Sequence, residues 1–356
     1  MQCKKKRGQK NVGTKISESE TNKWNFLEVG DSLEIIFPGK APCSEIHVLR
    51  SKEIVEDSGP RVLYDPNAVC PQNSAFPYYS NDVSGRARNL ISALEGPSSV
   101  LWAFRGGFGC VEVIERLESL GYEPPSTPKL LVGHSDITHL HALALKWGWT
   151  SLHAPVMGIS SETYDLTGVK ANRFTKLQDV VDVLLGKKRE LQYAFDLVYA
   201  PQSFDGTKSL FGSVVGGNAT LVKETLGTPT ALNTQGRFVF LEDTKEDPKR
   251  LSRVFVSLLR GGVFDHAQAI LFGSVPIKNA EEDREASLMS IRLFIKDHLI
   301  PRGLLIPVLY APDFGHGDYN YVLPFGTEAS LRRNGEKGIL TVSVNQPFEG
   351  KAEKGS

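Results

Sequence analysis

Residues 129–148 read KLLVGHSDITHLHALALKWG, in which an unbroken apolar run passes directly into a helical repeat. Such a run is typical of a strand that is buried on both faces. In the segment that follows, apolar residues recur at spacings of three and four and the repeat ends in glycine, as in an amphipathic helix. The stretch therefore predicts a strand-to-helix unit of a parallel sheet covered by helices.

The same alternation continues on the N-terminal side of this unit. Apolar runs occur at 33–37 and 100–104, and helical repeats occur at 84–96 and 110–121. After about residue 208, strand-like and helical segments mix less regularly. We therefore predict an α/β protein with an N-terminal Rossmann-like parallel-sheet domain and a smaller C-terminal α+β domain. The length of 356 residues agrees with two domains, because a single core usually stops growing at roughly 250–300 residues.

The expected organisation has two domains, a connector and two tails. The connector holds one helical piece, 176–186, among polar residues. In the second domain, Asn334-Gly335 stands between apolar runs and predicts a hairpin turn. The predicted segments are a disordered tail (1–22), the α/β domain (23–160), the connector (161–208), the C-terminal domain (209–348) and a second tail (349–356).

Composition argues against several kinds of partner. Lys plus Arg and Asp plus Glu both number 41, which leaves no net field to hold nucleic acid or an anionic membrane. The longest apolar stretches are far shorter than the roughly 20 residues that span a bilayer, and the first twenty residues lack the apolar core of a secretory signal. We expect a cytoplasmic protein that acts on a small molecule or peptide. The cysteines show no CxxC spacing, which favours reduced thiols over disulfides or a zinc site; they are Cys3, Cys43, Cys70 and Cys110.

Ser135 is the first candidate for chemistry, because it stands where the strand of the opening stretch turns into the helix. Such a turn exposes the hydroxyl and sets the next backbone N–H groups at the positive end of a helix, beside any oxyanion that forms. Ser135 would equally serve as the helix N-cap. It departs from the G-x-S-x-G pattern of α/β-hydrolases, because Ile137 stands where that pattern has glycine.

The glycine-rich turn RGGFG (105–109) is the second candidate, and it also lies between a strand and a helix. Paired glycines allow close approach of the backbone and leave N–H groups free to bind an oxyanion. The alternatives are a purely structural turn and a dinucleotide-binding fingerprint. The fingerprint is incomplete, since Glu112 replaces its last glycine or alanine and the turn does not follow the first strand.

His316 and Glu242 are the candidates in the second domain. His316 lies between two glycines, which leaves it open either to act as a base or simply to be solvated. Glu242 and Asp243 end the apolar strand RFVFL, where a carboxylate either points into a cleft or merely marks the end of the strand. Neither is needed to cap the next helix, because Asp247 and Pro248 provide its N-cap and first turn.

Several histidines lie close together in the sequence and prompt a test for a metal site. Two of them, His139 and His141, would point about 200° apart on a helix. The sequence contains no H-E-x-x-H motif. No zinc site is therefore predicted. The histidines are His134, His139, His141 and His153.

Six strings, in their order along the chain, resemble the LD-carboxypeptidases and the related microcin C immunity peptidases, which are serine peptidases of one fold. This resemblance implies a second domain that is swivelling β-barrel-like and a first helix at 47–59. His134 departs from the family, which commonly has tyrosine before the serine. The strings are LEVGDSLEIIFPG (27–39), RARNLISAL with FRGGFG (86–94 and 104–109), GHSDIT (133–138), GGNATLVKETLGTP (216–229), FLEDTKEDPKRLSRVF (240–255) and FGHGDYNYVLPFG (314–326).

The resemblance implies a role for each catalytic residue. Ser135 would be the nucleophile, His316 the general base that takes its proton, and Glu242 the carboxylate that orients the histidine. The backbone N–H groups of Gly107 and Asp136 would form the oxyanion hole. Because the serine and the histidine come from different domains, the site would lie between them.

The resemblance also implies a reaction. The expected enzyme is a serine carboxypeptidase that hydrolyses an amide next to a C-terminal residue, by L,D-cleavage of murein tetrapeptide with release of D-alanine in cell-wall recycling. Arg105 and Asn218 are the expected substrate contacts, although either would also suit a structural role. No cofactor or metal is implied, and a cytoplasmic homodimer is expected.

Two alternatives stay open. The first is a peptidase that detoxifies peptidyl-nucleotide antibiotics, for which aromatic residues of the connector would supply a face for the base. The second, from another class, is a catalytically silent peptide-binding protein of the same fold. The aromatic residues are Tyr164, Phe174, Tyr193, Phe195 and Tyr199.

Overall fold

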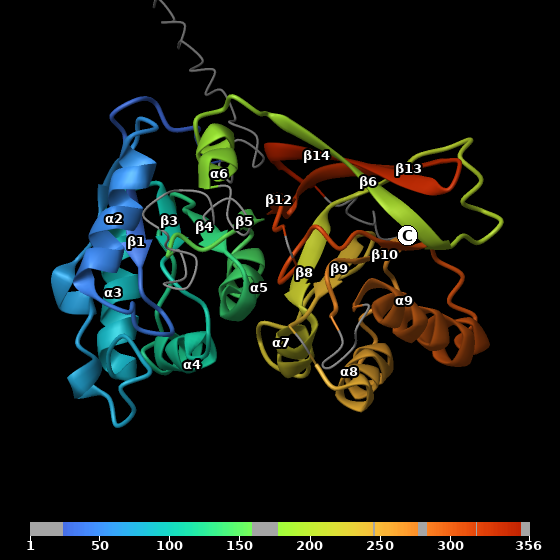
Figure 1. Cartoon of the computed structure of the whole chain (residues 1–356), viewed down its shortest axis with the longest axis horizontal. Helices are drawn as coiled ribbons and strands as arrows, with labels where there is room; N and C mark the ends of the chain where they lie inside the picture. The colour runs from blue at the N-terminus through green and yellow to red at the C-terminus, as the bar shows by residue number, and fades with distance from the viewer. Residues whose placement is uncertain (1–23, 159–176, 245, 277–282, 318, 350–356) are drawn as a thin grey trace, which may run out of the picture.

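The computed structural model describes residues 24–158, 177–244, 246–276, 283–317 and 319–349. They form two sheets that lie side by side, each with its own set of helices (Figure 1). Within these ranges, no helix has both the length and the apolar character needed to cross a membrane.

The first sheet has six strands in the order β12-β5-β4-β3-β1-β2. β1 to β5 run parallel, and β12 joins the edge strand β5 in antiparallel fashion. Every residue of β3, β4 and β5 is buried, as expected for strands covered on both faces. The strands are β1 (Ser32–Ile36), β2 (Arg61–Leu63), β3 (Val100–Ala103), β4 (Leu130–Gly133), β5 (Ser151–His153) and β12 (Leu323–Phe325).

Helices cover both faces of this sheet. α2 (Glu45–Glu56) and α6 (Leu177–Leu184) share one apolar core with the strands, and α3 (Val83–Glu95), α4 (Cys110–Ser119) and α5 (Thr138–Lys146) share the other. The alternation of side chains along each strand feeds both cores. Three 3₁₀ turns lie between these elements, at Pro66–Ala68, Pro71–Asn73 and Ser135–Ile137.

The second sheet has eight strands in the order β7-β13-β14-β6-β11-β10-β9-β8. β8 to β11 are parallel to one another, and the remaining pairs are antiparallel. The strands are β6 (Glu190–Tyr199), β7 (Leu210–Gly212), β8 (Val214–Asn218), β9 (Phe238–Glu242), β10 (Ala269–Phe272), β11 (Val308–Tyr310), β13 (Thr327–Asn334) and β14 (Lys337–Pro347).

The second sheet curls on itself. Phe240 of β9 shares a core with Leu331 of β13 and Leu340 of β14, although β9 and β13 lie far apart in the strand order. The outer face of the parallel strands packs on α7 (Ala219–Glu224), α8 (Pro248–Arg260) and α9 (Asp283–Phe294), which lie below the sheet in Figure 1. A π-helical turn (Ile295–Leu299) and a 3₁₀ turn (Ile300–Arg302) follow α9. The predicted fold class, a Rossmann-like domain with a barrel-like α+β domain, is confirmed.

Several local predictions are also confirmed. Asn334 pairs with Lys337 across a tight hairpin, α2 covers most of the helix expected at 47–59, and the side chain of Asp247 caps α8. The expected domain limits differ from the sheets in two places. β6, inside the expected connector 161–208, lies in the middle of the second sheet. Its first residues alternate between exposed and more buried positions, which is the period-2 pattern of a strand with one face in solvent, and the prediction of a connector overlooked that pattern.

The second difference is β12, which lies within the expected C-terminal domain 209–348 but completes the edge of the first sheet. The two sheets also meet at α5, where Thr138 Oγ1 accepts a hydrogen bond of 2.9 Å from the Asn218 N–H. Gly217 comes so close to Thr138 that a Cβ there would lie 2.5 Å from the same oxygen. This junction lies three residues after Ser135.

Candidate active site

The backbone at Ser135 is strained. Its φ of 63° is the one positive φ of a non-glycine residue in the described part of the chain, a conformation that costs about 1–2 kcal/mol for an L-residue. Ser135 begins the 3₁₀ turn between β4 and α5, and neither this turn nor α5 has a side-chain cap. The alternative that Ser135 is an N-cap is therefore wrong. Strain of this kind, at a sharp strand-to-helix turn, holds a hydroxyl above a sheet.

The glycine turn packs directly on Ser135. A Cβ on Gly106 would lie 2.9 Å from the Cβ of Ser135 and 3.3 Å from the backbone nitrogen of Asp136. Gly107, at φ 102°, occupies a conformation that favours glycine. Neither the Gly107 nor the Asp136 amide donates a hydrogen bond to any described residue. Two unused N–H groups thus belong to segments in contact around the Ser135 turn.

Two buried charged residues fix the glycine turn. Asp136 Oδ2 accepts a hydrogen bond of 3.0 Å from the Cys110 N–H, at the start of α4. Arg86 donates to the carbonyl oxygens of Pro38, at 2.9 Å, and Gly109, at 2.7 Å. Burial raises the pKa of the Asp136 carboxyl. Sequence reasoning missed Arg86, because one arginine in a helical repeat looks like an ordinary surface residue.

Glu242 and His316 form a close pair. His316 Nδ1 and Glu242 Oε2 are 2.6 Å apart, with the carboxylate fully buried at the end of β9 and the ring 21% exposed. Burial alone would raise the pKa of Glu242, but the attraction of His316 outweighs it and holds that pKa well below its usual range. Burial likewise opposes the protonation of His316, yet Glu242 outweighs it and raises the pKa of His316. A Cβ on Gly315 would overlap the Glu242 carboxylate, which explains the glycine before the histidine.

The neighbouring carboxylate, Asp243, has different partners. Its oxygens accept hydrogen bonds from Asn218 Nδ2 at 3.0 Å, from the Thr220 N–H at 3.1 Å and Oγ1 at 2.9 Å, and from the Thr244 N–H at 2.8 Å. Adjacent residues at the end of a strand point to opposite sides, so Asp243 ties down α7 while Glu242 meets the histidine.

The two expected substrate contacts lie in different surroundings. Asn218 is buried, and its side chain caps α7 through the Leu221 N–H at 3.2 Å while it donates to Asp243. That engagement favours a structural role for the side chain. Arg105 is half-buried at the glycine turn, with one guanidinium nitrogen 3.1 Å from Cys43 Sγ.

Ser135 and His316 are brought near each other through His134. The rings of His134 and His316 are 5.1 Å apart, edge to face, and His134 immediately precedes the serine. Within the described residues, no hydrogen bond joins Ser135 Oγ to His316. Burial, followed by repulsion from His316, lowers the pKa of His134 to about 3, so this ring is neutral near pH 7.

No three metal-ligating side chains gather at one point within the part of the chain that the structure describes. Of the four histidines considered for a metal site, His134 and His141 each pack on His153 with ring centroids 6.1 Å apart, but other groups engage some of their nitrogens. His141 bonds Ser151 Oγ at 2.9 Å and the Gly133 carbonyl at 3.0 Å, and His139 faces Glu224 at 3.6 Å.

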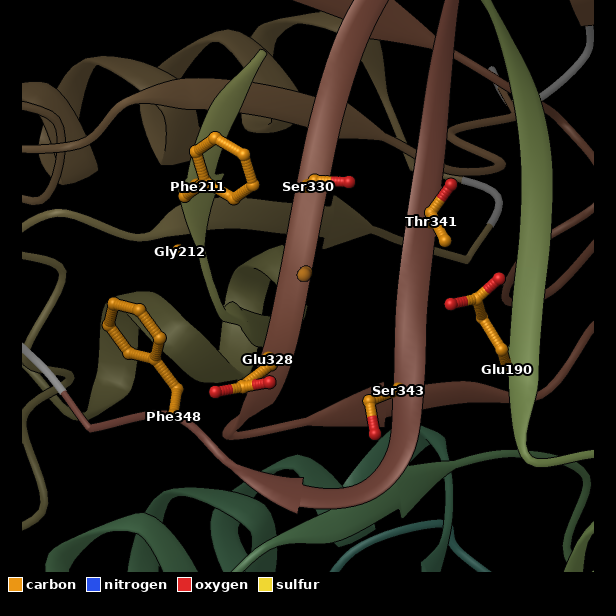
Figure 2. Close-up of a pocket in the computed structure, with 9 residues that line it drawn as sticks. Glu190, Phe211, Gly212, Glu328, Ser330, Thr341, Ser343 and Phe348 are labelled. Atoms are coloured by element: carbon orange, nitrogen blue, oxygen red, sulfur yellow. The ribbon is translucent and has the colours of Figure 1, made fainter.

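A cavity of about 290 Å³ opens elsewhere, on the face formed by β6, β7, β13 and β14 (Figure 2). Hydroxyls, two phenylalanines and two glutamates line it, and none of its residues belongs to the Ser135 or His316 segments. It therefore has no part in the candidate site. The lining residues are Glu190, Phe211, Gly212, Glu328, Ala329, Ser330, Thr341, Ser343 and Phe348.

A strained serine at the carboxyl edge of a parallel sheet, with a carboxylate-bound histidine packed on the residue before it, is the kind of arrangement found in hydrolytic α/β enzymes. The chain belongs to the LD-carboxypeptidase family. Residues 34–154 match the model of that family's N-terminal domain, and residues 211–331 match the model of its C-terminal domain.

Individual relatives agree with this membership. A carboxypeptidase-like protein of Rickettsia conorii is 30% identical over 274 residues, which cover 76% of this chain and 80% of the relative. The murein tetrapeptide carboxypeptidase of Pseudomonas aeruginosa is 27% identical over 263 residues, covering 73% and 81%.

Solved structures share the fold. The muramoyltetrapeptide carboxypeptidase of Oxalobacter formigenes has a TM-score of 0.67 at 23% identity and covers 89% of this chain and 100% of its own. The microcin C7 self-immunity protein MccF, in complex with glutamyl sulfamoyl guanosine, has a TM-score of 0.68 at 17% identity and covers 92% of this chain and 100% of its own.

Proposed function

We propose that the protein is a serine carboxypeptidase with Ser135 as nucleophile, His316 as general base and Glu242 as the carboxylate that orients the base. The observation that carries the proposal is the 2.6 Å contact between His316 Nδ1 and buried Glu242 Oε2. This contact fixes the tautomer with hydrogen on Nδ1, so Nε2 is the nitrogen left to accept a proton. The strained φ of Ser135 is the second support.

The proposed reaction is acyl transfer in two steps. Ser135 Oγ attacks the amide carbon while its proton moves to His316 Nε2, and the negative oxygen is bound by the N–H groups of Gly107 and Asp136. His316 then gives the proton to the leaving amine as the C–N bond breaks. Water, deprotonated by the same histidine, hydrolyses the acyl-enzyme. Serine and base need not be hydrogen-bonded before substrate arrives, since such bonds often tighten only in the complex.

The proposed substrate is a murein tetrapeptide, cut between an L-configured centre and the terminal D-alanine in cell-wall recycling. Relatives whose names specify murein tetrapeptide or muramoyltetrapeptide support this class. A terminal carboxylate needs a cation near the oxyanion donors. Arg105 next to Gly106 meets that need, whereas the engaged side chain of Asn218 is the weaker candidate for a contact.

The MccF complex with a sulfamoyl nucleoside favours a second candidate, hydrolysis of a peptidyl-nucleotide antibiotic. Such a substrate would need an exposed aromatic face. Phe195 is buried in the core of the curled sheet, and Tyr193 donates to the Val322 carbonyl at 2.5 Å. Tyr164 and Phe174 lie outside the described residues. Tyr199 is partly buried against the core between the second sheet and its helices. None of the three described aromatic residues therefore presents a fully exposed ring to such a substrate.

Two arms of one experiment test the proposal. Purified protein is incubated with L-Ala-D-Glu-diaminopimelate-D-Ala in one arm and with an aminoacyl sulfamoyl adenylate in the other, and released D-alanine and free amino acid are followed. We expect D-alanine from the first arm alone. Release of amino acid from the sulfamoyl adenylate alone would overturn murein tetrapeptide as the proposed substrate. A fluorophosphonate probe that fails to label Ser135 would favour the silent peptide-binding protein.

We further propose that the enzyme acts in the cytoplasm as a homodimer, as the family resemblance implies. Sedimentation equilibrium at micromolar concentration tests the dimer, and fractionation of cells tests the compartment. A monomer, or activity confined to the exported fraction, would contradict these two points without touching the catalytic assignment.

A further inference from the structure

The second oxygen of the Glu242 carboxylate faces a buried histidine. His153 ends β5, in the sheet opposite Glu242, and its Nε2 lies 3.9 Å from Glu242 Oε1. Both side chains are fully buried. Neither ring nitrogen of His153 has a hydrogen-bond partner within the described residues, and neither does Glu242 Oε1.

A purely space-filling role does not account for this arrangement. His153 packs against the rings of Phe240, at 5.1 Å, and Phe325, at 5.6 Å. In such apolar surroundings a buried polar nitrogen without a partner costs free energy that a phenylalanine would not. The same cost attaches to a buried carboxylate oxygen. His153 Nε2 and Glu242 Oε1 face each other across 3.9 Å, and a small rotation of either side chain brings them to hydrogen-bonding distance. A hydrogen bond between them would offset both costs.

We infer that His153 is a positioning residue for Glu242, an inference that rests on the proposed catalytic role of Glu242. Oε2 holds the Nδ1–H of His316, and the Nε2–H of His153 points at Oε1. With both oxygens held, the carboxylate does not rotate away when His316 accepts and releases the serine proton. Groups that orient a ligand from outside the reacting centre act in this way in metal sites.

The two histidines that pack on His153 bring no positive charge to the pair. The rings of His134 and His141 each lie 6.1 Å from His153. Burial is the main cause that lowers the pKa of both neighbouring histidines to about 3, so both are uncharged near neutral pH. The titratable side chains next to the pair include His316, on Glu242 Oε2, and the rings of His134 and His141, whereas Asp243 points to the opposite side of the strand end.

The test compares two substitutions of opposite character. His153→Phe keeps the ring and suits the apolar walls but removes the donor, and His153→Gln is less suited to those walls but keeps an N–H. If His153 positions Glu242, His153→Phe lowers kcat by roughly 10- to 100-fold with KM nearly unchanged, and His153→Gln recovers a large part of the loss. If His153 only fills space, the order is reversed. His139→Phe, which replaces another buried histidine beside a different carboxylate, Glu224, is the matched control and keeps full kcat.

A readout independent of activity separates this inference from the proposed function. The Nδ1–H proton of His316 gives a low-field NMR signal while Glu242 Oε2 holds it. We expect that signal to broaden or move in His153→Phe and to persist in His153→Gln and His139→Phe. An unchanged signal and unchanged kcat in His153→Phe would overturn the inference. Should Ser135→Ala prove fully active, the catalytic proposal falls, whereas the NMR comparison still decides whether His153 holds the carboxylate.

Discussion

Gly106 and Ser135 touch so closely that a Cβ on the glycine would lie 2.9 Å from the Cβ of the serine. The Ser135 turn and the glycine turn follow different strands, β4 and β3, yet they are in close contact. A side chain at residue 106 must therefore push Ser135 away from the proposed oxyanion donors, the N–H groups of Gly107 and Asp136, or shift those N–H groups.

Gly106→Ala should lower kcat/KM by about 100-fold, the scale expected for a misplacement of about 1 Å, while the circular dichroism spectrum stays native. Gly121→Ala is the matched control: Gly121 has positive φ, but a Cβ there meets nothing within 4 Å. The control should lose some stability and keep its turnover. Equal activity of Gly106→Ala and wild type would contradict the placement of the glycine turn beside the reacting carbonyl.

The strained backbone of Ser135 should lower the stability of the fold, and its hydroxyl should be needed for activity. Ser135→Ala keeps the strained φ and should lower kcat by at least about 1,000-fold without a change in fold, because a triad acts as a unit. Ser135→Gly should be equally inactive but more stable than Ser135→Ala by about 1 kcal/mol, since glycine adopts φ 63° without penalty. Turnover and urea denaturation measure the two effects. A glycine variant no more stable than the alanine variant would argue against strain at this position.

Substitutions of the adjacent carboxylates Glu242 and Asp243 should have different effects, the first on activity and the second on stability. Glu242→Gln removes the charge beside His316 and should lower kcat by several hundred-fold or more. Asp243→Asn disturbs the hydrogen bonds that hold α7 and should lower stability by about 1–2 kcal/mol with much of the activity kept. Kinetics and thermal melts on both variants check this. If the two exchange effects, Asp243 is the orienting acid.

These residues also show which parts of the candidate site could be predicted from the sequence alone. Ser135, His316 and Glu242 were named from the sequence because turn glycines, an apolar strand and a family resemblance marked each of them. The contact between Glu242 and His153 was not predicted, since it joins two strands from different sheets. Periodicity reports which residues are buried and is silent on which buried residues meet. Arg86 was missed because one arginine in a helical repeat looks like a surface residue, and its partners, the carbonyls of Pro38 and Gly109, are backbone atoms of distant turns.

β6 and β12 show why the limits of the two sheets are hard to predict from the sequence. β6 carries the period-2 alternation of a half-exposed strand, but it lies next to a polar segment and was grouped with that segment as a connector. β12 is only three residues long and pairs with the edge strand of the other domain's sheet. Its position depends on long-range pairing that no local pattern encodes.

The pair of His316 and Glu242 determines how activity should depend on pH. Glu242 raises the pKa of His316 above the ordinary value of 6.5, and only the neutral ring can take the serine proton. The kcat/KM of the wild type should therefore rise with pH through that raised pKa, with an acid limb above pH 6.5. In Glu242→Gln the attraction is gone and burial dominates, so the limb should move to lower pH while the plateau falls.

Folding stability should fall with rising pH over the range in which His316 loses its proton, whereas activity rises over that range. The protonated His316 contributes stability that is fully present below pH 6.5 and lost as pH rises through its raised folded pKa. Glu242, whose folded pKa is depressed, contributes stability that is present above pH 4.5 and lost as pH falls. Urea midpoints of wild type and Glu242→Gln, measured from pH 4 to 9, should therefore differ most between about pH 4.5 and 6.5. If the acid limb of kcat/KM lies at the same pH in Glu242→Gln as in the wild type, Glu242 does not control the protonation of His316.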